Sequence, residues 1–184
     1  MFALDDFASR AAQCAVDVCW RQWRALAGSG LGFGDRSATA IIDPEALVLL
    51  SLAVRQHERR LDDQLLLWAE SGAALLGAQR TRTLAKDFPA RVNGELAQFA
   101  AQTVAAGDPR WKVLAAGAAP TPTGRAGKGP REQRLLDPST LMLRLRAGFS
   151  VGAKADLLAF LLGTASASAE HRAGATVEVI AKAT

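Results

Sequence analysis

The 184-residue sequence predicts an all-α fold, and three observations carry the prediction. Aromatic residues make up only 6% of the chain and Tyr is absent, whereas the strong helix formers Ala and Leu are abundant. Apolar residues recur at steps of three and four along most of the chain, which is the spacing of one face of a helix. The pair Asp-Pro, a favourable helix start, occurs at 43–44, 108–109 and 137–138.

The first predicted helix covers residues 3–27. Its apolar stripe consists of Ala8, Ala12, Ala15, Cys19, Trp23 and Leu26. On the opposite face, Asp6 and Asp17 each precede an Arg by four residues, which is the favourable order for a helical ion pair. We expect the helix to end at Gly28, where a glycine-rich loop begins.

The clearest helix start is Asp43-Pro44-Glu45, in which Asp43 caps and Glu45 favours the positive end of the helix dipole. The residues that follow, up to Val54, are apolar all round, so this helix should form the centre of the core. Further helices are predicted over 60–71, 78–87 and 89–107, followed by a short turn through Trp111 and Leu114.

Residues 115–134 are rich in Gly, Pro, Thr and basic residues and have no apolar period, which predicts a flexible basic linker. After Asp137-Pro138, residues 141–146 alternate like a strand, but the Asp-Pro start favours a helix. A helix over 153–162 should pack through Ala153, Leu157, Phe160 and Leu161, and a last helix should start at Thr176. The sequence thus divides into a helical bundle domain (1–114), the linker (115–134) and a second unit (135–184).

Composition and charge exclude several classes of protein. No apolar run is long enough to span a bilayer, the N-terminus lacks a basic signal region, and two cysteines make no disulfide framework. We therefore expect a cytoplasmic protein that does not bind membranes. Residues 108–147 contain eight basic and three acidic residues, a net charge of +5. The rest of the chain has a net charge of −1, so the formal net charge of +4 is due to this segment. This segment is either a phosphate-binding patch or a solvated linker.

No motif predicts an enzyme, a metal site or a cofactor. The glycines of 28–34 lack the preceding strand of a dinucleotide fingerprint, and Lys128 is followed by Gly rather than the Ser or Thr of a phosphate-binding loop. His57-Glu58 lacks the second His of a zinc protease. Cys14 and Cys19 lie on different sides of a helix and are expected to be buried apolar residues.

The C-terminal part carries a resemblance to a known family. The segments LMLRLRAGFSVGAKADLLAFLLG (141–163) and TVEVIAKAT (176–184) resemble the opening helices of bacterial winged-helix transcriptional regulators. The upstream segments 41–55 and 60–76 are similar to the helical N-terminal part of such regulators. In the helix-turn-helix entry, Thr176 would cap, and Val177 and Ile180 would face the preceding helix. Ala181 would be the small residue that lets the first helix of the pair cross the second closely. The turn glycine would fall at position 185, so the recognition helix is expected to lie outside this sequence.

Two functions follow as hypotheses. The resemblance implies a transcriptional regulator that binds double-stranded DNA, with Arg144, Arg146 and Lys182 as the candidate phosphate contacts. The alternative is a helical protein–protein interaction module, such as an adaptor or an antitoxin-like partner. It is suggested by an Ala- and Leu-rich bundle whose apolar faces would be covered by a second copy or another protein.

Overall fold

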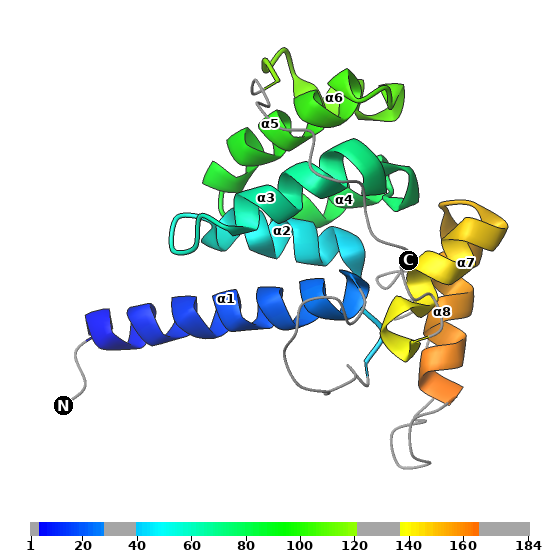
Figure 1. Cartoon of the computed structure of the whole chain (residues 1–184), viewed down its shortest axis with the longest axis horizontal. Coiled ribbons are helices and arrows are strands. Elements are labelled where there is room, and N and C mark those ends of the chain that lie inside the picture. Colours follow the sequence, from blue (N-terminus) through cyan, green and yellow to red (C-terminus); the bar gives the residue numbers. More distant parts are fainter. Residues whose placement is uncertain (1–3, 28–39, 121–136, 166–184) are drawn as a thin grey trace.

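A computed structural model describes residues 4–27, 40–120 and 137–165, and these residues form helices and no strand (Figure 1). The α-helices are α1 (Leu4–Ala27), α2 (Pro44–Val54), α3 (Leu61–Leu67), α4 (Ala78–Leu84), α5 (Arg91–Ala105), α6 (Lys112–Ala115), α7 (Leu141–Phe149) and α8 (Ala153–Ala165). Short 3-10 turns are η3 (Ala73–Leu75), η4 (Ala85–Asp87), η5 (Pro109–Trp111) and η6 (Pro138–Thr140), and η2 (Trp68–Gly72) is a π turn. The all-α prediction is confirmed for this part of the chain.

Helix α2 is the centre of the core, as predicted from its continuous apolar sequence. It packs against α1, α3, α4 and α5, and Leu47, Val48, Leu49 and Leu52 are all buried. The Asp43 carboxylate accepts a hydrogen bond of 3.0 Å from the Ala46 backbone N–H and so caps the helix. Pro44 occupies the first turn, where a missing N–H costs nothing.

The π turn η2 places Trp68 beside Trp23 of α1. The two indole rings lie 5.3 Å apart between centroids, and both side chains are buried. A Cβ atom built on Gly72 would lie 2.4 Å from the Trp68 ring. A glycine at position 72 is therefore required by the close approach of the indole, whose ring also packs against Trp23.

We predict that Gly72→Ala lowers the free energy of unfolding by about 1–3 kcal/mol, because the new methyl group forces the packed Trp68 ring to move. Gly94 is the matched control, since it also lies in a helix but has open space around its Cβ position. Gly94→Ala should stabilise the chain by about 0.5–1 kcal/mol through helix propensity. Urea denaturation measures both; equal effects of the two substitutions would contradict the steric argument.

Residues 137–165 pack directly on the helices that precede the predicted linker. Leu143 belongs to the same hydrophobic core as α2, and the Ile42 N–H donates to the Ser139 carbonyl at 3.1 Å. Figure 1 shows α7 and α8 side by side at the end of α1. The described part of the expected second unit therefore differs from a separate tethered domain, because it shares one core with the bundle.

The buried face of α8 differs from the prediction. Ala155, Asp156 and Ala159 are buried, whereas Leu157 and Leu161 are exposed. The helix turns its acidic residue inward because Asp156 pairs with buried arginine, as described below. On hydrophobicity alone, Leu157 and Leu161 were predicted to pack against the body.

Helix α1 contacts the body through its C-terminal half only. Val16, Cys19, Trp23 and Leu26 are buried, while residues 7–11 are exposed. In Figure 1 the N-terminal half of α1 extends past the other helices. The expectation of two buried cysteines is confirmed for Cys19 and wrong for Cys14, which lies on the extending half and is exposed.

Candidate functional site

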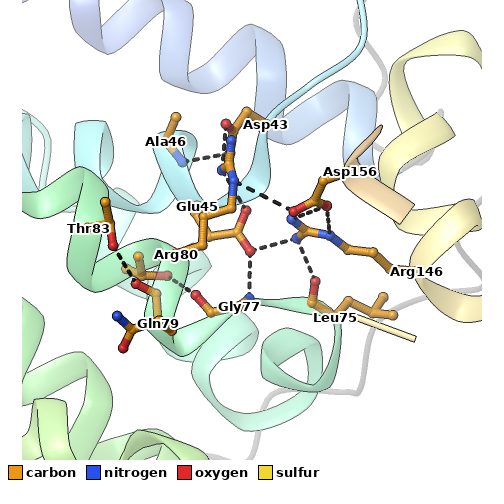
Figure 2. A network of polar contacts seen from close by, with 11 residues as sticks. Asp43, Glu45, Ala46, Leu75, Gly77, Gln79, Arg80, Thr83, Arg146 and Asp156 are labelled. Carbon is orange, nitrogen blue, oxygen red and sulfur yellow. Dashed lines mark hydrogen bonds and ion pairs between the residues drawn. The ribbon is translucent and has the colours of Figure 1, made fainter. Parts of the chain in front are cut away.

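The most concentrated polar chemistry in the described residues is a buried ion-pair cluster between α2, α4, α7 and α8 (Figure 2). It contains three carboxylates and two guanidinium groups: Asp43, Glu45, Asp156, Arg80 and Arg146. These residues are far apart in the sequence; 101 positions separate Glu45 from Arg146. The cluster therefore exists only because the chain folds.

Arg146 of α7 is the centre of the cluster, and its side chain is wholly buried. Its Nη1 donates to the Glu45 Oε1 at 2.6 Å and to the Leu75 carbonyl at 2.9 Å. Its Nε donates to the Asp156 Oδ1 at 2.9 Å, and Nη2 lies 2.8 Å from the same oxygen. The Asp156 Oδ1 thus faces the edge of the guanidinium formed by Nε and Nη2. The Glu45 carboxylate and the Leu75 carbonyl both contact Nη1.

Glu45 joins the cluster to the rest of the body. Its Oε1 also accepts a 2.6 Å hydrogen bond from the Gly77 backbone N–H, at the start of α4. Its Oε2 accepts from Nη1 of Arg80 at 3.2 Å, and Arg80 reaches further to the Asp43 carboxylate at 2.7 Å. The side chain that caps α2 is therefore tied through Arg80 to the buried carboxylate two residues later.

Burial sets the electrostatics of the cluster. It raises the pKa of the Glu45 carboxyl above its ordinary value, although the charge and hydrogen bond of Arg146 and the Gly77 N–H act in the opposite direction. Burial also opposes the charge of Arg146, but Glu45 and Asp156 outweigh it and raise the pKa of that guanidinium. The charge of the nearby Asp43 carboxylate also raises the pKa of Glu45, although less than burial does.

This shift predicts a pH dependence of stability. Because the pKa of Glu45 is higher in the folded chain than its ordinary value of 4.5, the folded chain binds more protons than the unfolded chain above that pH. The free energy of unfolding should therefore decline as the pH rises above 4.5 through the raised pKa. Urea titrations at several pH values measure the decline. The Glu45→Gln variant should lack it, and an equal decline in both proteins would contradict the assignment.

The cluster ties α2, α4, α7 and α8 together through ion pairs and hydrogen bonds. Its charged groups pair with one another and with backbone groups, and neither His nor Cys is among its members. No group of three or more His, Cys, Asp and Glu side chains suited to a metal ion occurs in the ranges that the structure describes. Within these ranges, no helix combines the length and apolarity needed to cross a membrane.

Two of the predicted phosphate contacts, Arg144 and Arg146, lie in the described residues, and only Arg144 is exposed. The prediction for Arg146 is wrong, because its guanidinium is buried and surrounded by Glu45, Asp156 and the Leu75 carbonyl. Arg144, two residues earlier on α7, is exposed and stays a prediction. Lys182 and the helix-turn-helix entry residues Thr176, Ile180 and Ala181 lie outside the described residues.

Four members of the cluster were not predicted from the sequence to belong to a common site: Asp43, Glu45, Arg80 and Asp156. A signal for two of them was present, since Glu45 and Asp156 are single acidic residues near the start of otherwise apolar helices. Such residues are rarely buried unless they are paired. For Glu45, a position near the positive end of the helix dipole was a sufficient explanation, and no sequence argument connected either residue with Arg146.

A second feature is the exposed apolar side of the extending half of α1. Phe7 is 71% exposed, Ala11 and Cys14 are exposed, and Val18 is half-buried. These residues follow one another at steps of four, three and four, so they lie along one side of the helix. The side is distinct from the buried stripe of Val16, Cys19, Trp23 and Leu26.

Comparisons with known proteins give no assignment. The chain matches no protein-family model, no curated protein and no solved structure.

Proposed function

We propose that this chain is a helical protein–protein interaction module whose docking element is the N-terminal half of α1. The observation that carries the proposal is a helix that leaves the body with one apolar side uncovered (Figure 1). Phe7 at its outer end is among the most exposed large apolar side chains in the described residues. Covering such a side chain is worth about 1.5–3 kcal/mol.

A partner would stabilise the extending part of α1 as a helix, as well as cover its apolar side. A free helical segment of about ten residues is marginal in water, since few hydrogen bonds offset the entropy of ordering it. Residues 6–14 gain little from the body, because none of their side chains is buried. A partner that covers Phe7, Ala11 and Cys14 would stabilise both the helix and its apolar side. The ion-paired body serves as the rigid base of this element.

Site-specific photo-crosslinking in cells that express the chain tests the proposal. A photoreactive phenylalanine analogue replaces Phe7 in one variant and Val113 of α6 in the control. The two positions are matched, since Phe7 is 71% and Val113 is 72% exposed. We expect a discrete covalent adduct from position 7 only, and Ala11→Glu in the same chain should abolish it by placing a charge in the contact.

Two results would overturn the interaction proposal. One is the absence of any adduct from position 7. The other is an identical set of adducts from positions 7 and 113, which would mean that exposure alone determines the crosslinks. The mass of a specific adduct also identifies its second component as another copy of the chain or as a different protein.

A second candidate is the DNA-binding regulator of the winged-helix type. It is supported by the basic excess of residues 108–147 and by the exposure of Arg144, a residue type suited to phosphate. Binding to duplex DNA should weaken steeply as salt increases, and Arg144→Ala should reduce the salt slope by about one. Arg82→Ala, at an exposed position of α4, is the control. An affinity that stays constant between low and moderate salt would contradict this candidate.

A further inference from the structure

The uncovered side of α1 has the spacing of a coiled-coil seam. Phe7, Ala11, Cys14 and Val18 alternate at steps of four and three, which is the a/d pattern of the heptad repeat. If Phe7 and Cys14 are assigned to position d of the heptad, Ala11 and Val18 occupy position a. A seam of this kind fits the same seam on another helix, because each side chain enters a hole between four residues of its partner.

The flanking residues determine which helix fits. Arg10 and Asp17 both occupy position g, while position e is occupied by the small residues Ala8 and Ala15. In an antiparallel pair of identical helices, g faces g and e faces e. Arg10 of each copy would then lie beside Asp17 of the other copy, which gives two such contacts in the pair. The alanines at position e would allow the two backbones to approach closely.

We propose that α1 pairs antiparallel with α1 of a second copy of this chain. The inference deepens the proposed function, on which it rests, by naming the partner. Phe7 would pack against Val18 of the second copy, and Ala11 against Cys14 of the second copy. A parallel pair lacks this complementarity, because g then faces e of the next heptad and Arg10 would meet Ala15.

The arrangement of the monomer is compatible with this pairing. The seam lies about 130° round the helix from the buried stripe of Val16, Cys19, Trp23 and Leu26, since successive residues are about 100° apart. The body covers the C-terminal half of α1, which in this register lies opposite the extending half of the other copy. Each extending half therefore meets a segment of α1 that is already held in place. In the monomer, Arg10 forms a 3.0 Å ion pair with Asp6 at an exposed position, where exchange of partners costs little.

The first experiment measures the mass of the full chain by sedimentation and light scattering over a concentration series. The wild type should form a dimer, and Phe7→Glu should raise the dissociation constant by about a hundredfold or more, since two copies of the contact are lost. Val113→Glu, at the equally exposed position on α6, should leave it unchanged. A monomer at all concentrations overturns the inference, and so does an equal effect of the two variants.

A charge exchange tests the antiparallel register. Arg10→Glu and Asp17→Arg should each weaken the dimer several-fold, because each places like charges side by side at two points. The double variant restores opposite charges in the antiparallel pair and should return the dissociation constant to near that of the wild type. A double variant as weak as the single ones overturns the register.

Oxidative crosslinking provides a test that does not depend on affinity. Ala11→Cys places a thiol beside Cys14 of the second copy and should give a covalent dimer rapidly, because a disulfide requires Cα atoms within about 7 Å. Ser9→Cys, at an exposed position on another side of α1, should not form a covalent dimer rapidly. Equal crosslinking of the two variants overturns the pairing. If the photo-crosslink from position 7 instead joins the chain to a different protein, the interaction function stands and the second copy is excluded as the partner.

Discussion

Arg146→Ala is expected to lower the free energy of unfolding by about 3–5 kcal/mol, the largest loss among single substitutions in the cluster. The truncation leaves Glu45 and Asp156 buried without their main cation, and the Leu75 carbonyl loses a donor. These groups come from α2, η3 and α8, so the packing of α7 and α8 on the bundle should weaken. Urea denaturation followed by circular dichroism measures the loss.

Arg144→Ala is the matched control, since it removes the same side chain from an exposed position of the same helix. Its effect should stay within about 0.5 kcal/mol. Glu45→Gln gives an intermediate case, because the amide retains an acceptor oxygen and removes the excess negative charge. We expect it to cost less than Arg146→Ala. Equal losses for Arg144→Ala and Arg146→Ala would contradict the assignment of Arg146 to a buried ion-pair cluster.

Trp23→Ala is expected to cost about 3–5 kcal/mol. Trp23 is buried, and its ring contacts Trp68 at a centroid distance of 5.3 Å. Its Nε1 donates a 2.9 Å hydrogen bond to the Ser51 hydroxyl, which in turn donates to the Leu47 carbonyl. Removal of the indole therefore opens a cavity between α1, α2 and η2 and leaves Ser51 without its donor.

Two variants separate the causes. Trp23→Phe keeps an aromatic ring and loses the hydrogen bond to Ser51, so about 1–2 kcal/mol is expected. Trp20→Ala truncates a half-buried indole three residues earlier, over which the Arg60 guanidinium lies at 5.7 Å, and should cost less than Trp23→Ala. Thermal and urea unfolding measure all three. A Trp20→Ala effect as large as that of Trp23→Ala would show that the buried cavity is not the main cause.

Local chemistry was sufficient to place the helices. Asp43-Pro44, Asp108-Pro109 and Asp137-Pro138 each precede a helical turn, as the sequence indicated. The segment after Pro138 was predicted as a helix in spite of its strand-like alternation, and α7 confirms that prediction. Caps, prolines and apolar spacing act within a few residues, so they can be read without knowledge of the rest of the chain.

Which side of α7 and α8 faces the body could not be predicted in this way. Arg144 and Arg146 differ little in sequence context, yet one is exposed and the other is wholly buried. On α8, the apolar pattern favoured Leu157 and Leu161, but Asp156 is the residue that faces inward. A short helix that is apolar on most sides offers little guidance on orientation, and a distant charge then decides it.

The sequence alone was enough to predict that this chain forms helices, where most of them begin and end, and that α2 is the centre of the core. The burial of Arg146, the exposure of Cys14 and the extension of half of α1 beyond the body follow from tertiary packing. The two sets of features depend on interactions of different range. Helix formation depends on neighbours within one or two turns, whereas burial and ion pairing depend on groups such as Glu45 and Arg146, which meet across 101 positions.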